Sequence, residues 1–175
     1  MTIPAPLDEV LGELPLVAAR LTAPRRVRVD ARPENLPALL ELLKGRLGFF
    51  HLSAISCVDW LEEGQFELVY HVWSDKLKLL LSAHVRIPRE PGEYVSIYDL
   101  HEPAGFFERD IHEMFGVVFD GALSLDRFIL TSWDGPPPMR KDFDARKYAE
   151  ETFSTVNYHP DWLKDIEAAG GGLEE

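Results

Sequence analysis

One short stretch of the chain gathers most of the side chains that could do chemistry. Residues 108–121 read ERDIHEMFGVVFDG, in which three carboxylates, an arginine and a histidine precede Gly116. Side chains of these types can transfer protons, bind a metal ion, or form ion pairs that hold one protein against another. The spacing of these residues and the character of the remaining chain decide among the three uses.

The spacing of the candidate ligands argues against a metal site. His112 and Glu113 begin like the zinc-protease motif, but the second histidine of that motif would fall at position 116, which is glycine. The six histidines show no ligand-like spacing, and we interpret them as surface or core residues. The chain has one cysteine, Cys57, whereas an iron–sulfur cluster takes about four cysteine ligands. We therefore predict no metal ion or cluster in this chain.

Nucleophilic catalysis and nucleotide binding find no support either. Cys57 and His51 share a face of the expected strand, but a rise of ~3.3 Å per residue separates them by about 20 Å. A nucleophile and its base must lie within hydrogen-bond reach, so we predict that Cys57 is a buried structural thiol. The chain contains no G-x-S-x-G, P-loop or G-x-G-x-x-G motif. We expect no catalytic residue and no bound cofactor in this chain.

The carboxylates of the stretch are also poorly placed for paired acid–base work. Glu108 and Glu113 are five residues apart, which puts them about 140° apart around a helix. The pairs Arg109–Glu113 and Glu108–His112 have the i,i+4 spacing of surface pairs, which contribute only about 0.3–0.5 kcal/mol each. An independent hydrolase that uses Glu108, His112 and Glu113 is an alternative, and it requires a pocket around these three side chains.

More charge follows this helix, at Arg127 and in the run Arg140-Lys141-Asp142. If these groups meet the charges of the helix in space, they form a buried or interfacial network, which adds geometric specificity more than stability. A solvated helix face is the other interpretation, and the residue types alone favour neither. The members of the predicted structural or partner-docking network are Glu108, Arg109, Asp110, Glu113, Gly116, Arg127, Arg140, Lys141 and Asp142.

The composition narrows the partners that this network can serve. The chain has 175 residues and a net charge of −12, a balance that argues against nucleic-acid binding. Its first 15 residues are acidic and interrupted by prolines, unlike a secretory signal. No apolar run approaches the roughly 20 residues of a membrane-spanning helix. We expect a cytosolic chain that reaches a membrane only through a partner.

The periodicity of the apolar residues predicts the elements that must position these charges. A leucine stripe at helical spacing over residues 36–47 indicates a helix, and residues 76–87 alternate as in a half-buried strand. Asp99 and Glu102 have the spacing of a capping box before the charged helix. The order β-α-β-β-β-β-α predicts an α+β fold, with a mixed or antiparallel sheet of about four to five strands and helices packed on one face.

The chain changes character toward its end. Three consecutive prolines after Trp133 favour an extended path, and an acidic stretch with several aromatic residues follows Phe143. Because a purely solvated tail has few aromatic residues, we expect these rings to cover a surface of this domain or of a partner. The predicted organisation is an N-terminal helical segment at 1–22, an α+β domain at 23–132, and an extended C-terminal arm at 133–175.

Two motifs resemble a known family. The first is Glu-Arg-acid-x-x-acid-x-Phe-Gly-Val-x-Phe-x-Gly from Glu108 to Gly121, and the second is Pro-x-Arg-Lys-Asp-Phe from Pro138 to Phe143, with Arg127, Ile129 and Leu130 between them. The pattern is similar to the C subunit of bacterial NADH:quinone oxidoreductase, the counterpart of the 30-kilodalton subunit of respiratory complex I. The resemblance covers roughly residues 25–145. Asp110 and Glu113 exchange the family's usual acids, and the family's histidines near Gly121 and Pro138 are absent here.

The resemblance implies a role without chemistry of its own. Members of this family are cofactor-free subunits of the peripheral arm, on the cytoplasmic side of the cell membrane. They pack against the large quinone-site subunit and a neighbouring cluster-bearing subunit, and the FMN and iron–sulfur clusters are expected in partner subunits. Related modules occur in membrane-bound energy-converting hydrogenases, which is a second possibility, and a free-standing binding module is a third.

The expected role of the charged network is to fix the route of the C-terminal arm and so to orient a docking surface. Within it, Arg140 is the group on which we place most weight, because a guanidinium can pair bidentately with a carboxylate such as Glu108. The proline run would give the arm a stiff path along the partner.

Overall fold

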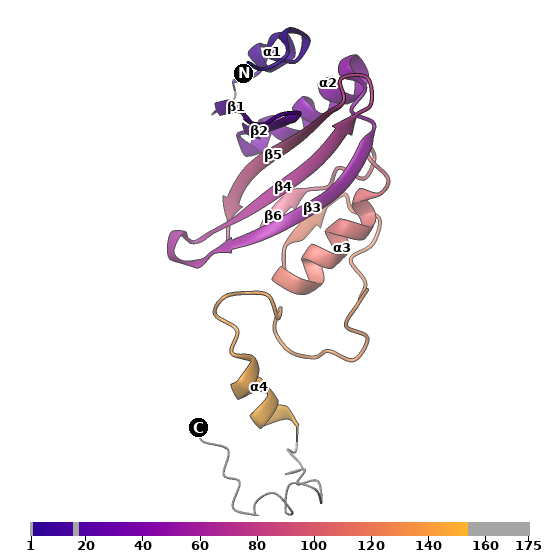
Figure 1. Ribbon diagram of the computed structural model, residues 1–175. Coiled ribbons are helices and arrows are strands. Elements are labelled where there is room, and N and C mark those ends of the chain that lie inside the picture. The colour runs from indigo at the N-terminus through magenta and orange to yellow at the C-terminus, as the bar shows by residue number, and fades with distance from the viewer. Residues whose placement is uncertain (1, 16–17, 154–175) are drawn as a thin grey trace, which may run out of the picture. The chain divides into compact units, whose positions relative to one another are not determined.

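The computed structural model describes residues 2–15 and 18–153 of the chain. Within these ranges, the chain forms four α-helices and seven strands in the order α1-β1-β2-α2-β3-β4-β5-β6-α3-β7-α4, and Figure 1 shows their arrangement. The helices are α1 Ala5–Gly12, α2 Leu36–Leu47, α3 Ala104–Phe115 and α4 Ala145–Thr152. The strands are β1 Ala18–Ala23, β2 Arg26–Asp30, β3 His51–Trp60, β4 Gln65–Ser74, β5 Leu79–Pro88, β6 Glu93–Val95 and β7 Val118–Asp120.

Five of the strands form one mixed sheet, in the order β1-β2-β5-β4-β3. Neighbouring strands are antiparallel except for β2 and β5, which run parallel. The parallel pair arises because α2 and two further strands intervene in the chain before β5 is laid beside β2. Strands β6 and β7 form a separate parallel pair. The predicted α+β class and mixed sheet are therefore confirmed.

One face of the large sheet builds the core. The buried residues of β5 alternate with less buried ones along the strand, as a half-buried strand requires. They join the leucine stripe of α2 and the inner side of α3 in one hydrophobic cluster, which includes Leu40, Leu81 and Ile111. On the side of the sheet that faces the viewer in Figure 1, none of the helices α1, α2 and α3 crosses the strands.

Two strands leave no signal in the sequence, for different reasons. The side chains of β1 are exposed or half-buried throughout, so this edge strand carries no apolar alternation. Strand β7 has three residues, which is too short for a periodic pattern. Because β1 belongs to the sheet, residues 1–22 are not a separate helical segment.

The chain divides into two compact units, 1–143 and 144–175. The first unit therefore continues past the predicted boundary at 132 and includes the proline run. In the second unit the structure describes residues 144–153, where the carboxylate of Asp144 caps α4 by accepting from the backbone amides of Arg146 and Lys147. The predicted arm beyond residue 153 lies outside the described residues.

Helix α3 begins without the side-chain cap that the sequence predicted, and it ends at a glycine. Pro103 occupies the N-cap position, so the predicted capping box of Asp99 and Glu102 does not form. Backbone bonds from Ala104 to His101 and from Gly105 to Glu102 serve the first turn instead. At the other end Gly116 adopts φ 79°, a left-handed conformation that ends the helix where the chain must turn back.

Among the residues that the structure describes, no helix combines the length and apolarity that a membrane span requires.

Candidate functional site

Residues 121–143, which we call the irregular segment, form the part of the first unit that the predicted network contacts. The segment contains no helix or strand, and none of its residues is fully buried. Ala122 and Leu125 pack against the core from partly buried positions. With so little apolar burial, the path of the segment has to be fixed by polar contacts, and those contacts come from charged side chains of α3 and of the strand ends.

Glu113 of α3 holds the middle of the irregular segment through the backbone. Its carboxylate accepts hydrogen bonds from the amides of Phe128, Ile129 and Leu130, at 3.1, 2.8 and 3.0 Å. Desolvation opposes the charge of Glu113, but these three amides and the nearby Arg127 outweigh it and lower the pKa of the carboxyl. One ionised side chain thus satisfies three consecutive amides that have no secondary-structure partner.

Arg109 holds the residues just before this point. Its guanidinium donates to the backbone oxygens of Asp126 at 3.2 Å and Arg127 at 2.9 Å, and it lies 4.9 Å from the ring centre of Phe128. The i,i+4 pair between Arg109 and Glu113 is therefore absent, because both side chains bind the irregular segment. Arg127 pairs with Asp134 at 2.8 Å, so this ion pair lies within the irregular segment.

Arg140 anchors the far end of the irregular segment to the end of α3. Its Nε donates to the backbone oxygen of Phe115 at 2.6 Å, and Nη1 donates to Glu90 at 3.2 Å. A Cβ atom added at Gly116 would lie 3.0 Å from Pro137 Cγ and 3.1 Å from Arg140 Nη2. Gly116 thus has two roles. It ends α3 in a left-handed conformation, and its lack of a side chain lets Pro137 and Arg140 of the irregular segment lie close to the helix end.

The predicted pairing of Arg140 with Glu108 is wrong. Glu108 is fully buried and accepts from Ser96 Oγ at 2.7 Å and from the Ile97 amide at 2.9 Å, so it fastens the residues after β6 to α3. Desolvation raises the pKa of Glu108, although these two bonds oppose the shift. The prediction allowed a buried network but gave Glu108 the wrong partner, because Glu108 turns toward the core and bonds the residues after β6.

A second set of charges, which the spacing of the sequence does not single out, holds the last residues of the segment. Asp59, near the end of β3, accepts hydrogen bonds from Arg89 Nε at 3.0 Å and Nη2 at 3.4 Å. Nη2 of the same guanidinium also donates to Asp142 at 2.5 Å. The Lys141 amide completes the set by donating to Asp59 at 2.9 Å. Arg89 is 9% exposed and Asp59 is 2% exposed, so this is a buried ion pair. The bond from Arg89 lowers the pKa of Asp142.

Asp59 and Arg89 gave no signal in the sequence because each stands alone among unlike neighbours, 30 residues apart. Only the β3-β4-β5 register brings the two strand ends together. Of the nine residues predicted for the network, five contact the irregular segment from outside or anchor it to the first unit: Arg109, Glu113, Arg140, Lys141 and Asp142. Asp110 is half-buried on α3, and desolvation, followed by the charge of Glu113, raises the pKa of its carboxyl.

The geometry does not support the hydrolase alternative. His112 bonds the Val117 backbone oxygen through Nδ1 at 2.9 Å, and Glu113 is committed to three amides. Both line a surface cleft of about 240 Å³, but Glu108 is sealed in the core and does not reach it. Cys57 is a partly buried thiol whose pKa desolvation and Asp59 raise to about 12, which disfavours a thiolate.

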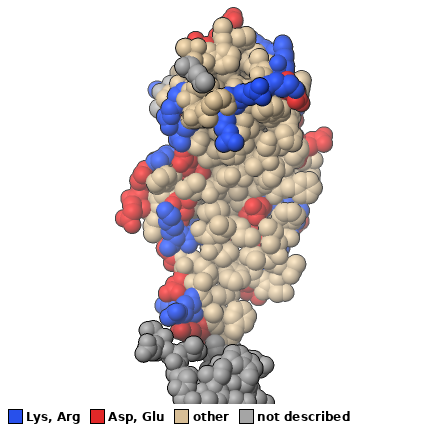
Figure 2. Space-filling view, viewed as in Figure 1, with Lys and Arg blue, Asp and Glu red and all other residues tan. Residues whose placement is uncertain are grey.

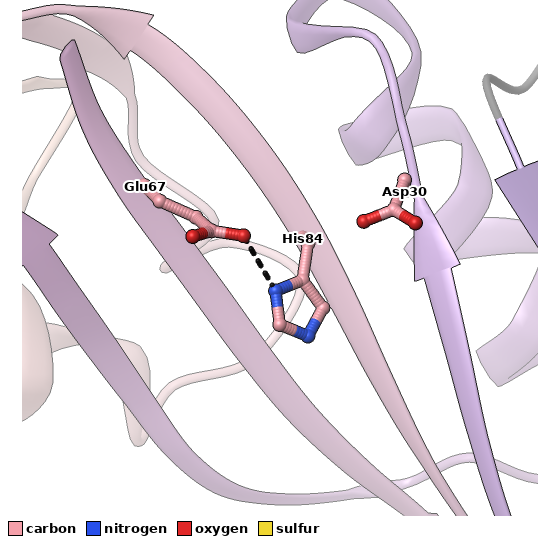
Figure 3. Close-up of side chains that lie close together, drawn as sticks. All are labelled: Asp30, Glu67 and His84. Carbon is pink, nitrogen blue, oxygen red and sulfur yellow. Dashed lines mark hydrogen bonds and ion pairs between the residues drawn. The ribbon is translucent and has the colours of Figure 1, made fainter. Parts of the chain in front are cut away.

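Within the described residues, one group of side chains has the composition and closeness of a cation site. Asp30, Glu67 and His84 project from three neighbouring strands of the large sheet, with ligand atoms within 4.8 Å of one another (Figure 3). His84 Nδ1 lies 2.8 Å from Glu67. Burial opposes the charge of Glu67, but the bonds from His84 and Trp60 outweigh it and lower the pKa of that carboxyl.

Comparison with known proteins relates these features to a family. The family model described as the respiratory-chain NADH dehydrogenase 30 Kd subunit matches residues 29–149. A C subunit of the NADH-quinone oxidoreductase of Rhizobium etli is 33% identical over 90% of this chain and 81% of its own length. The C subunit of the F(420)H(2) dehydrogenase of Methanosarcina mazei is 29% identical over 79% of this chain and 90% of its own length.

A solved structure, of an archaeal membrane-bound sulfane sulfur reductase, contains a chain similar to this one throughout. The two chains share 28% sequence identity and a TM-score of 0.78, and the match covers 89% of this chain and 94% of that chain. The matched range of the family model includes both α3 and the whole irregular segment.

Proposed function

The chain belongs to the family of the respiratory-chain NADH dehydrogenase 30 Kd subunit, and from this membership we propose that it is a structural subunit in the peripheral arm of a proton-pumping NADH:quinone oxidoreductase. In this proposal it holds no cofactor, while the flavin and the iron–sulfur clusters belong to partner subunits. It sits on the cytoplasmic side of the cell membrane and contacts the membrane only through its partners. Its neighbours are the large quinone-site subunit and a cluster-bearing subunit.

The structural role rests on one observation. The irregular segment exposes large apolar side chains while hydrogen bonds from charged side chains of α3 hold its backbone in place. Leu123, Phe128, Ile129 and Met139 are 69, 41, 54 and 57% exposed. Such side chains are costly to display in water unless a partner covers them. The backbone between them is tied down by Glu113 and Arg109, which is the arrangement of a preformed docking surface whose ordering cost is met before binding.

The chemistry of the chain agrees with a scaffold. One cysteine cannot supply the thiolates of a cluster. The charged groups that the hydrolase alternative would use are committed to structural bonds, as Glu108 and Glu113 illustrate. The chain therefore supports electron transfer from NADH to quinone by seating the subunits that perform it.

A second candidate is the equivalent subunit of a related membrane complex with a different electron donor. A chain of the archaeal sulfane sulfur reductase is 28% identical to this chain, and the C subunit of the F(420)H(2) dehydrogenase is 29% identical. This similarity to subunits of related complexes supports the second candidate. The two candidates share the scaffold role and differ in the electron-transfer subunits that surround it.

Co-purification tests both the role and the type of complex. The chain is tagged at its chromosomal locus, membranes are extracted in mild detergent, and the subunits that elute with the tag are identified by mass spectrometry. We expect a large assembly with cluster-bearing subunits, and a flavin-bearing NADH-oxidising subunit among them would select the NADH:quinone oxidoreductase. Elution of the chain alone, with turnover of its own, would contradict the proposal.

A further inference from the structure

The open face of the large sheet carries a group of side chains that the scaffold role does not use. Asp30 of β2 lies directly opposite His84 of β5 in the parallel register. Glu67 of β4 is the diagonal neighbour of His84, because Val69 is the residue paired with it. Three adjacent strands thus fix the three Cα positions, and rigid elements hold ligands more accurately than loops do.

The chemistry of this group is that of a transition-metal site. One imidazole and two carboxylates form a mixed nitrogen and oxygen donor set, and their candidate ligand atoms lie within 4.8 Å of one another. Around a tetrahedral Zn²⁺ with bonds of about 2.0–2.2 Å, ligand atoms stand roughly 3.4 Å apart. Small side-chain rotations on a fixed backbone close that difference.

We propose that Asp30, Glu67 and His84 bind a divalent transition cation, with Zn²⁺ the best fit and water as the fourth ligand. In the tautomer that carries its proton on Nε2, His84 Nδ1 presents its lone pair on the side of Glu67 Oε1, which lies 2.8 Å away, so that a cation can replace this hydrogen bond. Zn²⁺ suits this set because it accepts imidazole and carboxylate together and imposes no geometry of its own. Mg²⁺ does not suit it, because Mg²⁺ demands six oxygen ligands in near-ideal octahedral geometry.

Arg28 is the competitor for this position. Its Nε donates to Asp30 at 2.8 Å and its Nη2 to Glu67 at 3.2 Å, so one guanidinium now supplies the positive charge between the two carboxylates. Arg28 is 30% exposed and lines an open cleft of about 350 Å³, into which its side chain can swing. Arg20 also reaches Asp30, at 3.4 Å, from a side chain that is 57% exposed and is therefore weakly held.

A hydrogen bond to Oε2 holds the Glu67 carboxylate in an orientation that suits replacement of the Arg28 guanidinium by a cation. Trp60 Nε1 donates to Oε2 at 2.8 Å, which leaves Oε1 directed at His84 and Arg28. A partner of this kind orients a metal ligand from outside and raises affinity. The divalent cation brings twice the charge of the guanidinium, so the bound state neutralises both carboxylates while Arg28 returns to water.

Calorimetric titration of the full chain with Zn²⁺ in a non-chelating buffer tests the site, because the readout is binding and not activity. We expect one equivalent to bind the wild-type chain, His84→Ala and Asp30→Asn to weaken binding at least about tenfold, and Arg28→Ala to strengthen it. His71→Ala is the matched control, because His71 lies on the same face and bonds Ser82 instead. Mg²⁺ should give no comparable heat.

Each outcome decides the proposal. Circular dichroism without metal checks that the variants fold, and if His84→Ala does not fold, the more exposed Asp30→Asn carries the test alone. Equal affinity of the wild-type chain and a folded ligand variant would overturn the site. An Arg28→Ala chain that binds Zn²⁺ no more tightly than the wild type would overturn it as well, because the cation would then not take the place of the guanidinium.

Discussion

The sheet-and-helix body of the first unit and the irregular segment that crosses it are held by different forces. The body buries a continuous apolar cluster from α1 to β7, and its charges gather at the surface, as the blue Lys and Arg near β1 and β2 illustrate in Figure 2. The irregular segment buries nothing completely and depends on hydrogen bonds from ionised side chains. Burial therefore determines the shape of the body, whereas a few charges determine the path of the segment.

Because different forces hold the two regions, substitution of an exposed charged side chain should loosen the irregular segment and leave the body folded. Substitution of a buried charged side chain should also destabilise the body. Arg89 is such a buried side chain and gives the largest expected effect. Arg89→Ala leaves Asp59 buried and without its ion pair, which should lower the free energy of unfolding by about 3–5 kcal/mol. Urea denaturation measures this loss. A loss below about 1 kcal/mol would mean that Asp59 finds another partner, and the division into two regions would then be too simple.

Glu108 is a charge of the body and not of the segment. Glu108→Ala leaves the Ser96 hydroxyl and the Ile97 amide unsatisfied in the core, which should cost about 1–3 kcal/mol. Hydrogen exchange should show increased opening near β6 with the amides of residues 128–130 still protected. Loss of protection in residues 128–130 would contradict the separation of body from segment.

The pH dependence of stability should separate the two carboxylates of α3. Burial raises the pKa of Glu108 in the folded chain above its ordinary value near 4.5. The folded chain thus binds this proton more tightly than the unfolded chain does. The stabilisation that this proton gives the folded state is fully present below the unfolded pKa and is lost as the pH rises through the folded pKa. The stability of Glu108→Gln relative to the wild type should accordingly grow with pH across that window.

Glu113 should show the opposite dependence. Its amide partners lower its folded pKa, so its contribution is present above the unfolded pKa and is lost as the pH falls through the folded value. Matched denaturation curves of Glu108→Gln and Glu113→Gln between acid and neutral pH provide the test. Parallel curves for the two variants would refute the assigned environments.

Gly116→Ala should have a smaller effect on stability and a clear effect on the segment. The left-handed backbone is strained for alanine, and the new Cβ would lie 3.0 Å from Pro137 and 3.1 Å from Arg140, closer than ordinary van der Waals contact. We expect a loss of about 1–2 kcal/mol together with faster exchange around the Met139 amide, which bonds Met114 at 2.9 Å. Gly45→Ala is the control, because no atom lies within 4 Å of the added Cβ there.

Glu113→Gln should change the stability of the whole chain least, although it should change hydrogen exchange in the irregular segment strongly. Glu113→Gln keeps the shape of the side chain and removes its charge, so each amide bond to residues 128–130 weakens from a charged to a neutral one. The unfolding free energy should change by about 1 kcal/mol, while proton exchange at those three amides accelerates at least about tenfold. Unchanged exchange at these amides would break the assignment of Glu113 as the main fastening.

The body was predictable from the sequence because burial leaves a periodic record. The leucine stripe of α2 and the alternation of β5 each repeat at the period of their element. Gly48 ends α2 in a left-handed conformation. Strand β1 escaped detection because an exposed edge strand needs no alternation.

The site was predictable only in part, since contacts between charges leave no period. The two motifs pointed to Glu113, Arg109 and Arg140 as members of a network, but spacing did not reveal that they bind backbone groups. The pairing of Arg140 with Glu108 was wrong because helical spacing does not show that Glu108 turns toward Ser96 and Ile97 in the core. Asp59 and Arg89 depend on the sheet register, which local spacing does not encode.

Assembly of an Arg140→Ala chain tests the central claim most directly, namely that charged side chains fix the segment by which this chain is seated on its neighbours. The variant and the wild type are tagged in turn, and the amount of each in the membrane complex is compared with the amount folded in the cell. Arg26→Ala is the matched control, an exposed arginine of β2 with no ion pair among the described residues. We predict that Arg140→Ala folds but is several-fold depleted from the complex, and incorporation at the level of Arg26→Ala would contradict the account.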